Sequence, residues 1–344
     1  MAWASPQFSR RAVDRAGRAL VESSSSRETL EECLYVINNW RSSHSFPLNT
    51  FQVGLRRYAK QLDGSALVAQ RIKRLSSIDA KLRRFPRLNL SQMQDIGGCR
   101  AVVRDANAVT GMLRVYRESD LKHKLLRVDN YQAEPKPSGY RGIHLIYRYR
   151  SNKSETYNGL LVEIQIRSPL QHAWATAVET VGTFLKQSLK SSEGHDDWLY
   201  FFALMGSAIA LRENLPLVPK TPVDRHELVA ELRRVSLELD VINRLRAYGS
   251  AIRTLEEANV GDAHYFLMAL RPAENSVSII GYARSDLDTA TAEYLEVEKD
   301  LQSSFGAEAV LVSVESITSL KRAYPNYFLD TTEFLKALRV AIAK

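Results

Sequence analysis

The sequence predicts an α+β protein, in which helices flank a mixed β-sheet and a second, small α+β unit follows at the C-terminal end. Apolar residues recur at three- and four-residue spacing through the first 84 residues and again after residue 169. The short apolar or alternating runs between these regions are typical of strands. Three prolines between residues 215 and 222 then precede a region with its own strand and helix patterns.

The first part of the chain is expected to be helical. Helical spacing covers residues 6–84 and is clearest at 27–40, 51–62 and 67–83, and Pro86 ends it. The sheet is expected to follow, and its predicted elements are a buried strand at 99–103, a helix at 107–118, a strand at 124–128, a loop at 132–141, and adjacent alternating strands at 143–150 and 159–167.

A helix is expected to open at Pro169, because proline fits the first helical turn, and the helical pattern continues through Leu211. Asp224 precedes a long amphipathic stripe that predicts a helix to about Ala258, which either braces both halves or packs on one core. The remaining predicted elements are strands at 263–270, 276–282 and 309–314, and helices at 286–305 and 331–343. We therefore expect three units, at 1–222, 223–258 and 259–344.

Composition limits the partners and the compartment. The net charge of +8 and the pI near 9.4 favour anionic partners such as nucleotides or RNA. No run approaches 18 apolar residues and the N-terminus has no signal-peptide pattern, so we expect neither a membrane span nor export. The two cysteines, Cys33 and Cys99, are expected to be buried free thiols in a reducing cytoplasm.

A cationic helix face is the first candidate for chemistry. Lys73, Ser77, Lys81 and Arg84 recur at helical spacing, and Arg71 lies just before them. Such a face can clamp a triphosphate, although a solvated charged helix face is the alternative.

Two carboxylates form the second candidate. Asp95 directly precedes Gly97 and Gly98, where backbone and ligand can approach closely, and it can hold Mg²⁺ or simply cap a turn. Glu163 and Gln165 alternate and so share one face of a strand. Glu163 can act as a general base, or it can form a structural ion pair with Arg167 or Arg100.

The loop before the next strand is the third candidate. Tyr140 can stack on a base, and Lys136 and His144 can contact phosphates. The alternative is an exposed loop with a tyrosine that faces the core.

In order and spacing, these motifs resemble the synthetase domain of the RelA/SpoT-homologue family, over residues 71–174. The matching motifs are Arg-x-Lys-x-x-x-Ser-x-x-x-Lys from Arg71 to Lys81, Asp-Ile-x-Gly-x-Arg from Asp95 to Arg100, the loop from Lys136 to His144, and Glu-x-Gln-x-Arg from Glu163 to Arg167.

The resemblance implies a pyrophosphotransferase-like sheet that transfers the β,γ-pyrophosphate of ATP to a ribose hydroxyl, with Mg²⁺. The catalytic residues would be Asp95, Glu163 and Gln165, with Asp95 and Glu163 also holding the metal. ATP would be bound by Arg71, Lys73, Ser77, Lys81, Arg84 and Arg100. The acceptor would be bound by Lys136, Tyr140, Arg141 and His144, with Tyr140 stacked on its base.

Two departures from the family pattern bear on the activity. The N-terminus lacks a His-Asp metal motif and is short, so we do not expect a hydrolase that degrades the product. Ser138 stands where guanine-nucleotide synthetases often have Asn, which weakens the case for GTP or GDP as acceptor.

The segment Tyr324-Pro325-Asn326-Tyr327 resembles the Tyr-x-x-Tyr element of CapRel-type fused toxin–antitoxin proteins. That resemblance implies a monomeric enzyme that pyrophosphorylates the 3′ end of tRNA, stops translation, and is closed by its C-terminal unit until a phage capsid protein binds. Tyr324 and Tyr327 would then be regulatory, and the alternative is that they only pack a small core. A (p)ppGpp synthetase and a non-catalytic nucleotide-sensing regulator remain the other functional interpretations.

Overall fold

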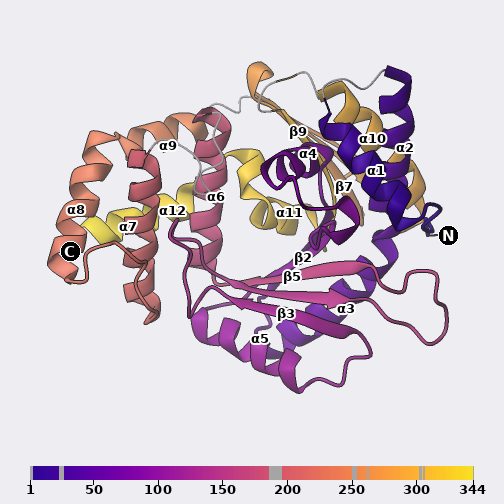
Figure 1. Cartoon of the computed structure of the whole chain (residues 1–344). Coiled ribbons are helices and arrows are strands. Elements are labelled where there is room, and N and C mark those ends of the chain that lie inside the picture. The colour runs from indigo at the N-terminus through magenta and orange to yellow at the C-terminus, as the bar shows by residue number, and fades with distance from the viewer. Residues whose placement is uncertain are drawn as a thin grey trace.

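The computed structural model describes residues 3–22, 27–185, 196–249, 254–261, 263–301, 304 and 307–343. Within them a nine-stranded mixed sheet runs in the order β3–β4–β5–β2–β1–β9–β7–β8–β6 (Figure 1). Its strands are β1 (Leu67–Ile72), β2 (Gly97–Val102), β3 (Lys124–Asn130), β4 (Ile143–Arg148), β5 (Leu161–Arg167), β6 (Thr254–Ala258), β7 (Tyr265–Arg271), β8 (Ser276–Tyr282) and β9 (Glu308–Ser313). The α+β class is confirmed.

Helices surround this sheet in three groups. In Figure 1, α5 lies below β3 and β5, the group α6–α9 with α12 lies to the left, and α1, α2 and α10 lie to the right. The helices are α1 (Arg10–Val21), α2 (Arg27–Ser43), α3 (Ser45–Leu62), α4 (Leu75–Arg84), α5 (Ala106–Glu118), α6 (Pro169–Leu185), α7 (Asp196–Glu213), α8 (Arg225–Glu238), α9 (Val241–Gly249), α10 (Leu287–Asp300), α11 (Ile317–Ala323) and α12 (Thr332–Ala343). None of the helices described is long and apolar enough to cross a membrane.

Most predicted elements are confirmed, but residues 67–72 were assigned wrongly to a helix. They form β1, which pairs with β2 along its whole length and with β9 at Gln70 and Arg71. A short apolar run is compatible with a buried strand or a helix, and here pairing on both sides decides for the strand. The helix that carries Lys81 begins only at Leu75.

The predicted connecting helix at 223–258 is also wrong. It breaks at Asp240, which adopts a left-handed φ of 48°, between α8 and α9. The sequence does not reveal this break because Val235, Val241 and Leu245 enter the same core on both sides of it. Residues 254–258 form β6, parallel to β8, while residues 250–253 lie outside the described residues.

The C-terminal region shares the sheet and a core with the rest of the chain. Strand β9 pairs with β1, and Phe334 and Leu338 of α12 pack into one apolar cluster with Trp174 and Phe202. The division into three units therefore stays a prediction, and removing the C-terminal residues would expose apolar side chains of α6 and α7. Of the two free cysteines, Cys99 is buried and Cys33 is half-buried.

Candidate active site

One face of β1, β2, β5 and β4 gathers most of the predicted chemical groups. The register places Arg71 opposite Gly98, and Gly98 beside Glu163. In the next row Arg100 lies beside Gln165, which lies opposite His144. Directly paired residues point to the same face, so these side chains form two rows across the sheet.

Asp95 lies just before β2 and holds two lysines. Its Oδ2 accepts from Nζ of Lys73 at 2.7 Å, and its Oδ1 accepts from Nζ of Lys81 at 2.9 Å. Burial would raise the pKa of Asp95, but the charges of Lys73 and Lys81 outweigh it and hold that pKa below its usual range. Burial in turn lowers the pKa of Lys73. Asp95 is therefore an ionised carboxylate in a site that accepts cations.

Glu163, on β5, is held on both of its oxygens. Its Oε1 lies 2.8 Å from Nδ1 of His144, and its Oε2 accepts from Nε2 of Gln165 at 2.6 Å. Burial would raise the pKa of Glu163, but His144 and the hydrogen bonds outweigh it, so the pKa lies well below its usual range. The predicted alternative, an ion pair with Arg167 or Arg100, is not among its interactions in the described residues.

The donor set fits Mg²⁺. Asp95 and Glu163 are ionised oxygen ligands close enough to affect one another's charge. Mg²⁺ is commonly bound through one or two carboxylates, with substrate phosphates completing its shell. In the part of the chain that the structure describes, no group of three His, Cys, Asp or Glu side chains forms an all-protein metal cage. Asp95 and Glu163 are thus the residues that would hold the ion.

The ring of Tyr140 is covered, and the core-facing alternative describes it better than the predicted base stack. Only 2% of the residue is exposed, and both Lys136 and Arg167 lie over the ring, each 5.2 Å from its centroid. The half-buried Tyr131, at the mouth of the same loop, has Nζ of Lys136 4.5 Å from its ring centroid. Sequence reasoning missed Tyr131, although an aromatic residue directly after a strand was a usable signal.

Arg141 donates hydrogen bonds to the backbone of the surrounding fold, and its predicted role in binding the acceptor stays a prediction. Its guanidinium donates to the backbone oxygens of Gln132 and Pro216, and burial lowers its pKa to about 10. The loop is anchored on α7, because Gly139 has a φ of 93° and a Cβ there would lie 2.6 Å from the oxygen of Phe202. Arg141 therefore has a structural role.

The predicted ATP-binding cations divide into two groups. Lys73 and Lys81 meet at Asp95, and Arg71 and Arg100 share the face described above. Burial lowers the pKa of Arg100 to about 10, and repulsion from Arg167 adds to this. The other two predicted residues make different contacts. Ser77 accepts from Nε of Arg74 at 3.4 Å, and the exposed Arg84 lies over the ring of Phe85 at the end of α4 and repels the ammonium of Lys136.

The segment with Tyr324 and Tyr327 is part of an apolar core and also contacts Arg100 and Arg74. The two tyrosines are buried with residues of β1, β7 and β9 and so do pack a core, while their regulatory role stays a prediction. The hydroxyl of Tyr324 donates to the backbone oxygen of Gln70 at 3.1 Å, and its ring centroid lies 5.1 Å from the guanidinium of Arg100. Arg100 also donates to the backbone oxygen of Ala323. Arg74 donates to the hydroxyl of Tyr327 at 3.2 Å.

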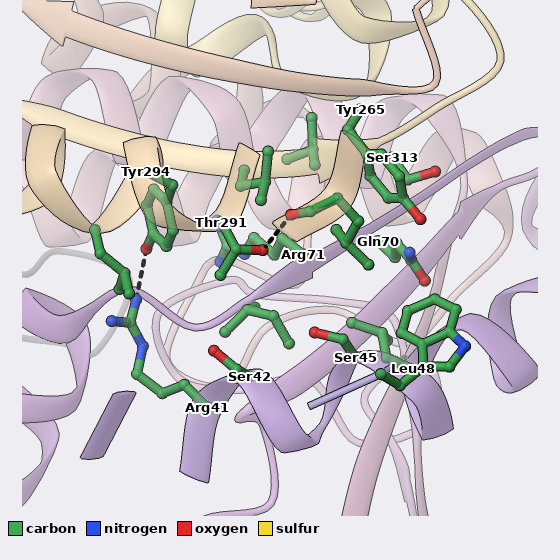
Figure 2. Close-up of a pocket in the computed structure, with 16 residues that line it drawn as sticks. Arg41, Ser42, Ser45, Leu48, Gln70, Arg71, Tyr265, Thr291, Tyr294 and Ser313 are labelled. Atoms are coloured by element: carbon green, nitrogen blue, oxygen red, sulfur yellow. Dashed lines mark hydrogen bonds between the residues drawn. The ribbon is translucent and has the colours of Figure 1, made fainter. Parts of the chain in front are cut away.

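A second C-terminal contact was not predicted. Figure 2 shows the pocket that Arg71 lines together with residues of α2, α10 and β9, and Arg41 and Tyr294 meet at one side of it. The carboxylate of Glu298 pairs with Arg41 at 2.7 Å and accepts from the backbone N–H of Leu75 at 2.7 Å. Glu298 of α10 therefore caps the first turn of α4.

Together, the mixed sheet and two carboxylates among Lys, Arg and His side chains define a site suited to nucleotide phosphates. Residues 70–183 match the family model described as the region found in RelA / SpoT proteins. This part of the chain therefore matches the RelA/SpoT region that the motifs predicted.

The chain is similar to two curated proteins of Bacillus subtilis (strain 168). It is 36% identical to GTP pyrophosphokinase YjbM over 114 residues, which cover 32% of this chain and 52% of that protein. It is 30% identical to GTP pyrophosphokinase YwaC over 112 residues, which cover 31% of this chain and 52% of that protein. The chain therefore spans about half the length of these relatives.

Among solved structures, small alarmone synthetase 1 from Bacillus subtilis bound to its product pppGpp is 22% identical, with a TM-score of 0.43, covering 50% of this chain and 89% of that one. A GTP pyrophosphokinase family protein from Streptococcus pneumoniae is 21% identical, with a TM-score of 0.41, covering 49% and 84%.

Proposed function

We propose that this chain is an ATP-dependent pyrophosphokinase that transfers the β,γ-pyrophosphate of ATP to a ribose hydroxyl. The observation that carries the proposal is the pair of ionised carboxylates, Asp95 and Glu163, surrounded by Lys73, Lys81 and His144 within the RelA/SpoT region.

In this proposal the chain's residues mainly position charge. When ATP binds, Lys73 and Lys81 release Asp95 and bind the phosphates. Glu163 takes the proton of the attacking hydroxyl. Mg²⁺, when bound at Asp95 and Glu163, would neutralise the phosphate charge that develops during transfer.

We propose the 3′ end of tRNA as the acceptor. Lys124 and Arg148 lie directly opposite each other on β3 and β4, both are exposed, and the register places them on the same face as Glu163. Like charges directly opposite destabilise a sheet, and a polyanion would relieve this repulsion. Ile146 pairs with Glu163, and Arg148 lies two residues beyond Ile146. The backbones of Arg148 and Glu163 are therefore ~7 Å apart along the strands and ~5 Å apart across them.

A guanosine nucleotide is the second candidate acceptor. The curated relatives are named as GTP pyrophosphokinases. In this chain Tyr131, with Lys136 over its ring, offers a half-buried aromatic face beside His144 for a base.

We further propose that the Tyr324–Tyr327 segment holds the enzyme closed and that a phage protein, in our prediction a capsid protein, opens it. The contacts of Tyr324 with Arg100 and of Tyr327 with Arg74 support this part of the proposal. An activator must then prefer the open form by an amount comparable to the free energy of closure. The proposed reaction uses ATP and tRNA, so we propose that the protein acts in the cytoplasm, and we expect it to be a monomer.

The test is transfer of ³²P from γ-labelled ATP to total tRNA or, separately, to GDP. It uses the full chain and its Tyr327→Ala variant, because α12 shares a core with α6 and α7. Labelled tRNA that disappears in the double variant Tyr327→Ala, Glu163→Ala would support the tRNA enzyme. Label on GDP alone would make the chain an alarmone synthetase, and no label on either acceptor would leave the pyrophosphokinase proposal without support.

A further inference from the structure

Five side chains around the proposed base form a closed ring of hydrogen bonds. Nη2 of Arg167 donates to the hydroxyl of Tyr140 at 2.8 Å and to Oε1 of Gln165 at 3.0 Å. The hydroxyl of Tyr140 lies 2.5 Å from Nε2 of His144. His144 and Gln165 then reach the two oxygens of Glu163, as described above. Arg167 and Glu163 thus lie at opposite points of the ring, joined by one branch through Tyr140 and His144 and another through Gln165.

The chemistry of the two ends sets the direction of every bond in the ring. Arginine only donates, whereas an ionised carboxylate only accepts. On the short branch, the Gln165 amide therefore presents its oxygen to Arg167 and its nitrogen to Glu163. On the long branch, Nδ1 of His144 carries the hydrogen that Glu163 accepts. In a neutral imidazole, Nε2 is then an acceptor, and it receives the hydroxyl hydrogen of Tyr140.

The burial of Arg167 indicates that it serves this ring rather than a salt bridge. The residue is 1% exposed, and its Nε and Nη1 have no hydrogen-bond partner among the described residues. No ion pair with a carboxylate is found for it in the same part of the chain, and Arg100 is a repulsive neighbour. Burying a guanidinium in this way is costly, so a structural role alone accounts for it poorly.

We propose that Arg167 is a positioning residue for Glu163, acting through Tyr140 and Gln165. Because Arg167 only donates, it leaves the hydroxyl hydrogen of Tyr140 for Nε2 of His144, so that Nδ1 of His144 donates to Glu163 and each oxygen of Glu163 holds one hydrogen bond. The remaining lone pairs of Glu163 are then aimed at the acceptor hydroxyl. The proposal rests on the pyrophosphokinase function for its kinetic consequences but not for the tautomer.

The kinetic test compares three variants of the full chain. Arg167→Gln introduces a group that can both accept and donate, so we expect kcat to fall about 100-fold, as for a misplaced reactive group, with the KM for ATP within about twofold of the original. Arg167→Lys is still only a donor and should recover at least a tenth of the original kcat. Tyr140→Phe keeps the aromatic side chain and breaks only the branch of hydrogen bonds through Tyr140 and His144, so we expect kcat to fall about tenfold.

The spectroscopic test does not depend on turnover. Nitrogen chemical shifts of ¹⁵N-histidine-labelled protein at pH 8, with the His144 signals assigned through His144→Gln, should report an Nδ1–H tautomer. In Arg167→Gln the amide oxygen can accept the hydroxyl hydrogen of Tyr140, so Nε2 should carry a hydrogen in part of the molecules, whereas Arg167→Lys only donates and should keep the original tautomer. If Arg167→Gln does not fold, the tautomer can still be measured in the original chain. The kcat values can still be compared among the original chain, Arg167→Lys and Tyr140→Phe.

An Nε2–H tautomer or an imidazolium in the original chain would overturn the inference, as would equal kcat values for Arg167→Gln and Arg167→Lys. The expected tautomer without labelling of any acceptor would instead count against the proposed function and leave the positioning role of Arg167 intact.

Discussion

Two of the contacts between the C-terminal region and the region of the candidate active site have opposite chemistry. At the first, the ring of Tyr324 lies against the guanidinium of Arg100, and the hydroxyl of Tyr327 accepts a hydrogen bond from Arg74. At the second, the carboxylate of Glu298 pairs with the buried Arg41 and accepts from the backbone N–H of Leu75. We call them the aromatic contact and the carboxylate contact.

The difference lies in what can replace each contact. A nucleotide base can stack on an arginine as a tyrosine ring does, so the aromatic contact is exchangeable for the proposed substrate. The carboxylate contact satisfies a backbone donor at the start of α4 and neutralises a buried charge, and no substrate group is placed to do either. The aromatic contact is therefore suited to regulation, and the carboxylate contact to holding the loop that carries Lys73.

The largest expected effect is on stability, at the carboxylate contact. Glu298→Ala should lower the free energy of unfolding by about 3–5 kcal/mol, because it leaves Arg41 buried without its partner. Urea denaturation measures this change. The matched control is Glu315→Ala, which removes a partly exposed ion pair with Lys60 that also joins the two regions and should cost ~0–1 kcal/mol. Equal losses in the two variants would show that Glu298 has no special role.

The next largest effect is expected at the aromatic contact. Keeping 99% of the molecules in the closed form requires a free-energy difference of only about 2.7 kcal/mol between the open and closed forms. Truncating a buried aromatic side chain typically removes about 3–5 kcal/mol of stabilisation. Tyr327→Ala should therefore raise pyrophosphate transfer up to ~100-fold and stop growth when expressed, since the closed form is no longer favoured. The double variant with Glu163→Ala should be harmless. Normal growth with Tyr327→Ala protein accumulating would contradict regulation at this contact.

The sequence predicted the carboxylate site better than it predicted these contacts. Asp95, Glu163, Lys73 and Lys81 lie in local motifs whose spacing fixes which groups meet, and the structure brings them together. The partnership of Glu298 with Arg41 joins residues 257 positions apart and has no local signature.

The differences between these expectations and the structure have one origin, in packing between residues far apart in the chain. Residues 67–72 were predicted to be helical because the strands that pair with them on both sides lie later in the chain and leave no local signal. Tyr140 was expected to face a base, but Trp174 and Phe202 from later helices form the cluster that covers its loop. Arg141 was assigned to the acceptor because nothing in its neighbourhood indicates that Pro216 accepts its hydrogen bond.

A smaller effect is expected from pH on the helix turn next to the carboxylate contact. His44 is buried, its Nδ1 lies 2.7 Å from the backbone oxygen of Trp40, and burial lowers its pKa to about 4. Its lowered pKa means that the unfolded chain binds more protons, so stability is lost as pH falls from about 6.5 towards 4.

Between pH 8 and pH 5, His44 should thus remove about 2 kcal/mol from the free energy of unfolding. His44→Asn keeps a donor for Trp40 and should abolish this part of the loss in urea denaturation at the two pH values. The exposed His226→Asn on α8 is the control and should leave the pH dependence as it is. An unchanged difference in His44→Asn would mean that His44 is not the group responsible.

The smallest effect separates the ring from the hydroxyl within the aromatic contact. Tyr324→Phe removes only the hydrogen bond to the oxygen of Gln70 and keeps the ring against Arg100. A hydrogen bond of this kind contributes about 1 kcal/mol, so the open fraction and the transfer rate should rise about fivefold. Because the ring is the part that can be exchanged for a base, Tyr324→Ala should exceed this by at least another factor of ten in the ³²P assay. Equal rates in the two variants would mean that the hydrogen bond from Tyr324 to Gln70, and not the ring, keeps the enzyme closed. A nucleotide base could then replace the aromatic contact no better than it could replace the contact of Glu298.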